Sequence, residues 1–310
     1  MLIDPFSEIL KLVNAESLLT GGFAAGGTWA IRFPAPDKIK FAVVAKGGCW
    51  IRIEGEPEAV YAVAGDVLLL NAPRSFVLAS DSATLPEASV NAMELFGKGN
   101  NYATVGDGKD FSYLGGHVLL DPSSGRLLAD VLPPWIHIRA ASSQATKLQW
   151  LVEQLVHERA STLPGASLVS AQLAQIMFIQ ILRAHLETSE SFGAGWLRAL
   201  GDHRVAPALR LMHSDPSRAW HLEELAEAVA MSRTSFALHF KKVVGVAPLS
   251  YLTQWRMHLA ERALRTGDVS VAALAWSLGY TSESAFSTAF KRATGKAPKN
   301  YQLTARLASK

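Results

Sequence analysis

The chain has 310 residues, of which 49% are hydrophobic and 18% are charged. This composition is ordinary for a globular protein, and the length allows two domains with separate cores. The first residues include acids where a signal peptide has bases, and no run of about 18 uninterrupted apolar residues exists, so neither secretion nor a membrane span is expected. Cys49 is the only cysteine, which excludes an intrachain disulfide and a cysteine metal cluster and fits a reducing cytoplasm.

Charge is distributed unevenly along the chain. Residues 201–310 carry 15 Lys+Arg and 8 Asp+Glu, a net charge of +7, whereas residues 1–200 carry 15 and 19, a net charge of −4. A basic C-terminal third indicates an anionic partner such as nucleic acid. A basic face that simply contacts solvent would give the same counts, so charge alone leaves both interpretations open.

The N-terminal part, residues 1–143, is predicted to be a domain of short strands. A brief helix that ends before Gly21 is expected first, because its apolar residues have helical spacing. From about residue 23 to 139, short runs rich in β-branched and aromatic residues alternate with Gly, Pro, Asp and Asn. Many short strands at this spacing predict a small antiparallel barrel or jelly roll.

Two helices are predicted over residues 144–187, separated by Pro164 and Gly165. Their apolar residues recur at helical spacing, so they are expected either to cover the barrel or to pair with a second copy of the chain. Residues 188–203 are small and polar apart from Phe192 and the stretch near Trp196, and are predicted to be a linker to a C-terminal domain over residues 204–310.

The C-terminal third contains a repeat. The segment FKKVVGVAPLSY at 240–251 recurs as FKRATGKAPKNY at 290–301, and Leu225-Ala226 recurs as Leu274-Ala275. Each copy predicts a helix-turn-helix, over about 221–245 and about 270–295, with a small residue where the two helices cross. Ser232 and Ser282 are suitable N-caps, and a long helix beginning at Pro248 is expected to join the copies.

The second helix of each copy has one apolar face and one free face that can enter a DNA major groove. Residues near its start are expected to reach base edges, and the basic pairs at its end are expected to contact phosphates. The predicted base readers are Arg233, Thr234, Leu238, Glu283, Ser284, Ser287 and Thr288. The predicted phosphate contacts are Lys241, Lys242, Lys291 and Arg292.

The two copies differ in what they offer the bases. Ala237 and Leu238 can contact a thymine methyl group but cannot form bidentate hydrogen bonds to a purine, so weaker direct readout is expected from the first copy. Glu283 can accept a hydrogen bond from a cytosine amino group, or it can complement the positive N-terminus of its own helix. Both roles for Glu283 remain open.

Residues 205–305 resemble the DNA-binding domain of the AraC/XylS family of transcriptional regulators. The second copy carries the likeness, with ALAWSLGY at 273–280 followed by Ser282, Phe286, Phe290-Lys291-Arg292, Gly295, Pro298 and Tyr301. The resemblance implies two reading helices in successive major grooves on one face of DNA. It also implies contact with RNA polymerase.

Residues 4–140 resemble the cupin-like sensor domain (AraC-binding type) of one branch of that family. The matching segments are DPFS at 4–7, GTWAIRF at 27–33, GCW at 48–50, AGDVLL at 64–69 and LPP at 132–134. The resemblance implies dimerisation through residues 144–187 and control by a small organic effector.

No metal site and no cofactor are expected in the sensor domain. Its first 140 residues contain only two histidines, His117 and His137, from which the ligand set of a catalytic cupin cannot be built. An apolar effector pocket is predicted instead, although its aromatic members are equally suited to the barrel core. The predicted pocket residues are Trp29, Phe41, Trp50, Phe76 and His117.

These features predict an α+β protein with an N-terminal cupin-like β-barrel or jelly roll, covering helices and an all-α C-terminal domain. Its expected role is that of a cytoplasmic, bacterial, homodimeric transcriptional regulator that binds double-stranded promoter DNA and is not an enzyme. Two other classes remain open at this stage: a cupin metalloenzyme with an accessory DNA-binding segment, and a helical protein-interaction adaptor.

Overall fold

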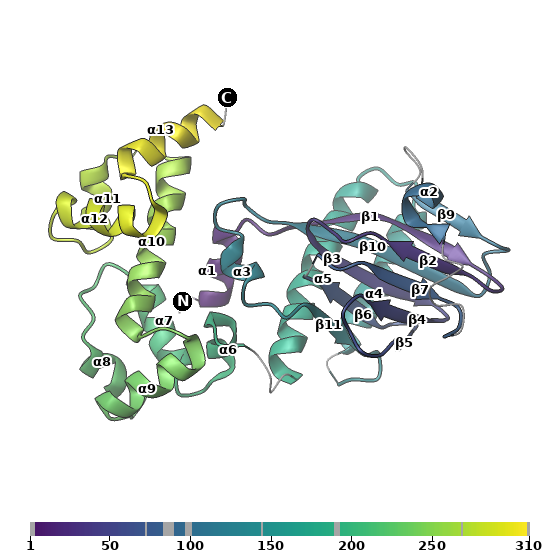
Figure 1. Cartoon of the computed structure of the whole chain (residues 1–310), viewed down its shortest axis with the longest axis horizontal. Helices are drawn as coiled ribbons and strands as arrows, with labels where there is room; N and C mark the ends of the chain where they lie inside the picture. Colours follow the sequence, from purple (N-terminus) through teal and green to yellow (C-terminus); the bar gives the residue numbers. More distant parts are fainter. Residues whose placement is uncertain are drawn as a thin grey trace. The chain divides into compact units, whose positions relative to one another are not determined.

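The computed structural model describes residues 4–71, 73–82, 90–96, 101–143, 145–188, 193–267 and 269–308. The chain divides into two compact units. One, here called the barrel unit, comprises Asn14–Asp121 and Leu132–Ser191, and the other, the helical unit, comprises Met1–Val13, Pro122–Val131 and Phe192–Lys310. Figure 1 shows the strands of the first and the helices of the second. The predicted α+β class, with a β-rich N-terminal domain and a helical C-terminal domain, is confirmed.

The barrel unit contains two sheets. Their strands are β1 (Glu16–Ala25), β2 (Ala30–Phe33), β3 (Ile39–Lys46), β4 (Gly48–Ile53), β5 (Val60–Val63), β6 (Val67–Leu70), β7 (Phe76–Ala79), β8 (Val90–Asn91), β9 (Tyr102–Val105), β10 (Phe111–Leu119) and β11 (Trp135–Ile138). The larger sheet has the order β11-β6-β3-β10-β1-β9, and the smaller has the order β5-β4-β7-β2-β8. A short helix, α2 (Ala92–Phe96), follows β8. Pairing is antiparallel except between β1 and β9 and between β2 and β8.

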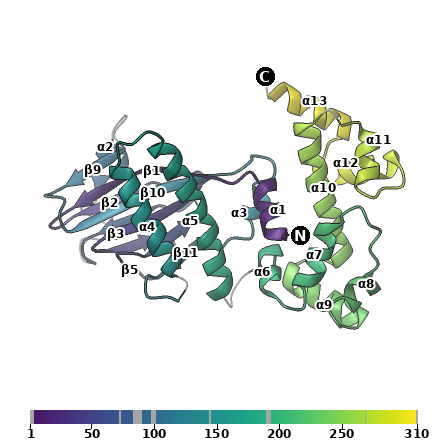
Figure 2. The ribbon, with the colours of Figure 1, turned by 180° about the vertical axis from the view of Figure 1, so that it is seen from behind.

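Alternation along the strands separates the interior of the barrel from its outer face. In β3, Ala42 and Val44 belong to the interior cluster, which also contains Phe23, Phe76 and Phe111. The intervening side chains of β3 lie on the other face of the sheet, against which α4 (Ala145–Ala160) and α5 (Ala166–Thr188) pack. Figure 2 shows these two helices lying across the larger sheet.

Helix α5 is unusually apolar. Among the described residues it is the one helix whose length and composition would allow it to cross a membrane, over Ala166–Glu187, and 28% of that window is buried. Core helices of soluble proteins pass the same test of length and composition, and α5 buries Met177, Phe178, Ile181 and Leu182 completely. Its inner face therefore serves as the cover of the sheet.

The helical unit is built around α10 (Pro248–Thr266). In Figure 1, α8 and α9 lie toward one end of α10 and α11, α12 and α13 toward the other. The remaining helices have the following bounds: α1 (Pro5–Leu12), α3 (Arg126–Ala129), α6 (Trp196–Gly201), α7 (Ala206–Ser214), α8 (Leu222–Glu227), α9 (Arg233–Val244), α11 (Val271–Ser277), α12 (Glu283–Thr294) and α13 (Pro298–Ala308). Pro248 occupies the first turn of α10, as predicted.

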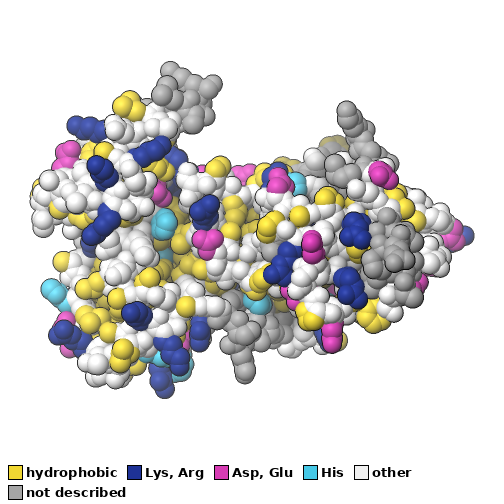
Figure 3. Space-filling model, in the orientation of Figure 1, with side chains coloured by type: hydrophobic (Ala, Val, Ile, Leu, Met, Phe, Trp, Pro, Cys, Tyr) yellow, Lys and Arg dark blue, Asp and Glu magenta, His cyan; other side chains and the backbone are white. Residues whose placement is uncertain are grey.

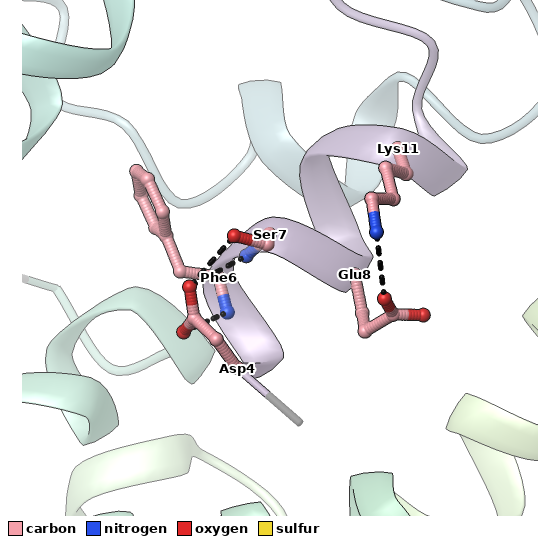
Figure 4. Close-up of polar contacts among 5 residues, drawn as sticks. All are labelled: Asp4, Phe6, Ser7, Glu8 and Lys11. Carbon is pink, nitrogen blue, oxygen red and sulfur yellow. Dashed lines mark hydrogen bonds and ion pairs between the residues drawn. The ribbon is translucent and has the colours of Figure 1, made fainter. Parts of the chain in front are cut away.

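The first helix belongs to the helical unit and not to the barrel. Its N-cap is Asp4, whose carboxylate accepts hydrogen bonds from the backbone N–H groups of Phe6 (3.1 Å) and Ser7 (3.3 Å) and from the Ser7 hydroxyl (2.7 Å) (Figure 4). An ion pair between Glu8 and Lys11 at 3.3 Å lies one turn further along. The helix ends at Leu12, and Leu18 and Leu19, which were expected in it, lie in β1.

Three polar and aromatic contacts hold this part of the helical unit together. The Trp196 indole N–H donates to the Leu127 carbonyl oxygen at 2.7 Å, the Phe6 and Trp196 rings lie 6.5 Å apart, and the Ser124 hydroxyl donates to the Leu12 carbonyl oxygen at 3.0 Å. The structure therefore divides the chain differently from the predicted boundaries at 143 and 203. Residues 4–13, 122–131 and 196–201 pack in the helical unit because their apolar side chains find partners there.

Candidate functional site

The two predicted helix-turn-helix motifs are present and have matching turns. In the first, α8 precedes α9 and the Met231 N–H donates to the Ala226 carbonyl oxygen at 3.0 Å. In the second, α11 precedes α12 and the Tyr280 N–H donates to the Ala275 carbonyl oxygen at the same distance. Both alanines are buried, because the second helix of each motif crosses closely at this point and leaves no room for a larger side chain.

The ends of both second helices are set by local signals. Ser232 and Ser282 accept hydrogen bonds through their hydroxyl oxygens from the third residue of each helix, at 3.3 and 3.1 Å. Gly245 and Gly295 terminate the helices in the left-handed conformation. Each helix turns two fully buried phenylalanines inward, namely Phe236 and Phe240 in α9 and Phe286 and Phe290 in α12. The opposite face of each helix is thereby fixed toward solvent.

Residues 232–242 and 282–292 match position by position: each residue of the first range is buried, half-buried or exposed in the same way as its counterpart 50 positions later. All predicted phosphate contacts are exposed. Among the predicted base readers, Ser287 is half-buried and the others are exposed; Ala237, which faces the same way, is also half-buried. The structure therefore gathers these side chains on one free face of each helix.

The predicted phosphate contacts Lys241, Lys242, Lys291 and Arg292 form no ion pair with any described residue. Their charges are thus available to an outside anion. Figure 3 shows Lys and Arg side chains, in dark blue, on the face of the helical unit that is seen in that view. Arg233 differs, because its guanidinium contacts the Glu223 carboxylate of α8 at 2.8 Å, with both side chains more than half exposed.

Arg256 on α10 is a positioning residue that the sequence did not reveal. Its guanidinium donates to the carbonyl oxygens of Pro216 (2.6 Å) and Arg218 (2.8 Å) in the loop before α8. The same group lies 5.8 Å from the Tyr280 ring in the turn of the second motif. One side chain of the joining helix thus contacts parts of both motifs. A charged residue at the junction of two motifs leaves no distinct sequence signal.

The barrel unit has a cavity of about 450 Å³, whose lining includes Phe33, Ala92 and Tyr113 of the interior cluster. Its described lining consists of Thr20, Gly21, Gly22, Phe33, Pro34, Ala35, Pro36, Asp37, Lys38, Lys40, Ala92, Phe96, Asn101, Tyr113, Gly115, Gly116 and His117. Of the five predicted pocket residues, His117 alone belongs to this lining. Burial, followed by the charge of Lys38, lowers the pKa of His117 below its ordinary value, so the ring is largely neutral at pH 7.

The four predicted aromatic residues lie elsewhere. Trp29 and Phe76 are part of the interior cluster, and the Phe76 ring stacks behind the lining residue Phe33, with ring centroids 4.7 Å apart. Phe41 is fully buried on the face of β3 opposite Ala42, and half-buried Trp50 packs against Tyr61 with ring centroids 5.3 Å apart. Sequence periodicity shows that such side chains are buried but not in which layer, so these aromatic residues could not be assigned to a pocket.

The Asp66 and His137 side chains and the Cys49 thiol lie outside this cavity lining. His137 contacts the Asp66 carboxylate at 2.8 Å, and Asp66 also accepts from the N–H groups of Ala140 and Val63. Burial would raise the pKa of Asp66, but these hydrogen bonds outweigh it and lower the pKa. Cys49 is buried, and burial together with the Asp66 charge raises the pKa of its thiol to about 12. In the part of the chain that the structure describes, no three His, Cys, Asp or Glu side chains converge as a metal site would require.

Comparison with known proteins agrees with both parts of this architecture. A family described as cupin matches residues 4–187, and a helix-turn-helix domain family matches residues 225–304. A putative AraC-like transcription regulator from Streptomyces lividans is 40% identical over 301 residues, which cover 97% of this chain and 98% of that protein. The chain belongs to the AraC family of transcriptional regulators.

Another sequence relative of this AraC-family regulator agrees with the assignment. The HTH-type transcriptional regulator AlkR of Acinetobacter baylyi is 30% identical, over 89% of this chain and 91% of AlkR. Among solved structures, the DNA-binding domain of AdpA in complex with a target DNA is 30% identical, covers 34% of this chain and 95% of that chain, and has a TM-score of 0.33. The full-length sequence relatives carry the assignment to a non-enzymatic family of DNA-binding regulators.

Proposed function

We propose that this AraC-family regulator inserts α9 and α12 into two successive major grooves of promoter DNA. The observation that carries this proposal is the identical exposure of the two helices, each with a free face that ends in two unpaired cations. Helix α10, which joins the motifs, has 19 residues and is about 28 Å long. That length is comparable with the roughly 34 Å between successive turns of one DNA groove.

The exposed residues divide by chemistry into two groups. Arg233, Thr234 and Leu238 of α9 and Glu283, Ser284, Ser287 and Thr288 of α12 are proposed to meet base edges. Lys241, Lys242, Lys291 and Arg292 are proposed to bind phosphates, which fixes the register without reading sequence. Affinity should fall steeply with salt, because each phosphate contact releases counterions. RNA polymerase is a proposed partner on the basis of family membership.

Cytoplasmic location and homodimerisation are also part of the proposal. Helices α4 and α5 cover the larger sheet with one face, while Trp150, Leu168, Val169 and Ile176 on their outer faces are exposed. On α5, the exposed residues Val169, Gln172, Ile176 and Arg183 follow one another at intervals of three, four and seven residues and form one stripe, and exposed Leu168 lies beside its start. Exposed apolar stripes of this kind are typical of protein interfaces, and a second copy of the chain is the proposed occupant.

The dimer is tested by sedimentation of two matched variants. Val169→Glu places a charge in the stripe, whereas Val63→Glu places it at a valine of equal exposure on β5 of the other sheet (44% and 43% exposed). We expect Val169→Glu to shift the protein toward monomer at low micromolar concentration and Val63→Glu to leave it dimeric. Dimers of equal stability in both variants would exclude this stripe as the interface.

The DNA-binding proposal is tested by selecting bound duplexes from a random pool with the full-length protein. Two enriched sequence blocks about one helical turn apart are expected if both motifs read bases. Binding without an enriched motif would leave only phosphate contacts, and absence of binding at about 50 mM salt, where non-specific binding is strong, would favour the adaptor class instead.

A further inference from the structure

The cavity of the barrel unit contains a lysine in an apolar setting. The Lys40 ammonium lies 4.7 Å from the centroid of the Phe33 ring and 5.4 Å from that of Phe76, and these two rings are stacked 4.7 Å apart. No described residue forms a hydrogen bond or ion pair with it. Burial lowers the pKa of Lys40 to about 8, so at pH 7 Lys40 is still charged in most molecules of the protein. The ring faces compensate for lost hydration only in part.

A second polar group of the same cavity also has no partner. Tyr113 is 3% exposed, and its hydroxyl is among the buried polar atoms without a hydrogen bond in the described structure. Burial raises the pKa of Tyr113, so the hydroxyl stays protonated and can donate. A buried hydroxyl without a partner is costly, and such groups commonly await a ligand or water.

Strand register brings these groups to one wall. On adjacent strands, Lys40 of β3 is paired with His117 of β10, and Ala42 is paired with Gly115. Gly115 is in turn paired with Gly21 of β1. Gly21, Gly115 and Ala42 thus lie side by side on three adjacent strands, and their small size leaves room for the cavity. A Cβ atom on Gly115 would lie 2.9 Å from the Tyr113 hydroxyl oxygen, which places that oxygen beside the floor of the cavity.

We propose that this cavity binds a small organic carboxylate with an apolar body, and that Lys40 and Tyr113 hold its carboxylate group. The charges of the described lining are Asp37, Lys38 and Lys40, and with His117 neutral their sum of +1 suits a monoanion. Phe33 and Phe96 supply apolar surface for the rest of the ligand. The volume lies within the range of about 300–1,000 Å³ typical of small-molecule pockets.

This inference rests on the proposed function as a DNA-binding regulator and on the resemblance of the barrel unit to cupin-like sensor domains, which implies a small organic effector. It names the class of that molecule. The test is titration calorimetry of the full-length protein with butanoate, octanoate, dodecanoate and benzoate, and with octanamide as the neutral counterpart of octanoate. One or more of the carboxylates should bind, and octanoate should bind about tenfold more tightly than octanamide, because a charged pair replaces a neutral hydrogen bond.

Two lysine variants separate the proposed ligand from a general effect of charge. Lys40→Met should abolish the preference for octanoate over octanamide, whereas Lys38→Met, at an exposed lysine of the same lining, should retain it. Tyr113→Phe should weaken binding of both compounds. Without ligand, Lys40→Met should also raise the melting temperature, since a half-buried charge beside two phenyl rings is removed. A purely structural lysine would give the opposite change.

The inference is overturned if none of the carboxylates binds, if octanamide binds as tightly as octanoate, or if Lys38→Met and Lys40→Met act alike. DNA binding by ligand-free wild-type protein, measured in parallel, keeps the two proposals distinct. Intact DNA binding without carboxylate binding would refute the ligand class alone. Carboxylate binding without DNA binding would refute the proposed function, whereas the proposal that the cavity binds a carboxylate would stand.

Discussion

The two helix-turn-helix motifs have the same geometry but different surfaces. At equivalent positions, Leu238 of α9 corresponds to Thr288 of α12, and Ala237 corresponds to Ser287. Leu238 is 67% exposed although nothing in its own motif requires an apolar residue there. The duplicated Phe pairs keep the scaffold constant, so the free face can vary at little cost to folding. The comparison shows that the fold fixes where a reading side chain lies, whereas the exposed residues set what it can recognise.

The turns provide the largest predicted difference between the motifs. Gly279 has φ of 78°, and a Cβ atom there would collide with the backbone oxygen of Ser217; Ala230, at the equivalent position, has φ of 54° and is exposed. We expect Gly279→Ala to lower the free energy of unfolding of the helical unit by at least about 2 kcal/mol, from backbone strain plus the collision.

The reciprocal change, Ala230→Gly, should raise the free energy of unfolding by about 0.5–1 kcal/mol, because the strain of a left-handed alanine exceeds the extra entropy of glycine in the unfolded chain. Urea unfolding of the full chain, followed by helix content, measures both. If the two substitutions changed the free energy of unfolding by the same amount in opposite directions, the two turns would be equally constrained.

The next prediction concerns base reading. The double variant Ser284→Ala, Thr288→Ala should weaken binding to the selected duplex by about tenfold, since two hydroxyl hydrogen bonds at about 0.5–1.5 kcal/mol each are lost. The loss should map to one block of the selected motif. Leu238→Thr, which copies Thr288 into the first motif, should change the preferred bases of the other block. Selection repeated with each variant is the measurement, and an unchanged first block after Leu238→Thr would argue that α9 reads no bases.

Phosphate contacts should behave alike in the two motifs. Lys241→Ala and Lys291→Ala should each weaken binding several-fold on all sequences and reduce the slope of log K against log salt by about 0.9. Fluorescence anisotropy from 50 to 200 mM salt, with a selected and a scrambled duplex, gives both quantities. If a variant lost affinity only for the selected duplex, the substituted lysine would be a base reader and not a phosphate contact.

The smallest expected effect is at the ion pair between Glu223 and Arg233, which has no counterpart in the second motif because position 272 is alanine. Glu223→Ala should strengthen DNA binding about two- to threefold, because an exposed pair of this kind is worth about 0.2–1 kcal/mol and Arg233 is released. Glu227→Ala, on the same helix and without a described ion pair, is the control for the change in net charge. Equal gains from both variants would assign the effect to charge alone.

The sequence predicted the helical unit well where its structure depends on near neighbours. Ser232 and Ser282 cap helices through hydrogen bonds to residues three positions away, and each turn closes over five residues. A single helix-turn-helix pattern is weak evidence for a DNA-binding domain, and its duplication in this chain made the prediction specific. Of the predicted pocket residues only His117 lines the barrel cavity. The sequence could not bring Lys40 to the same place, because Lys40 and His117 are 77 positions apart and meet only through strand pairing. Periodicity could not decide that Phe41 faces the covering helices while its neighbour Lys40 faces the cavity.

By itself, the sequence determined the two classes of secondary structure, the duplicated motif and the face that each second helix presents, because these follow from local propensity and periodicity. The tertiary structure alone decided that the first helix joins the helical unit, that Arg256 contacts both motifs, and that Lys40 and Tyr113 line one cavity. Those arrangements depend on strand register and on packing between segments distant in the chain, and a local sequence pattern contains neither.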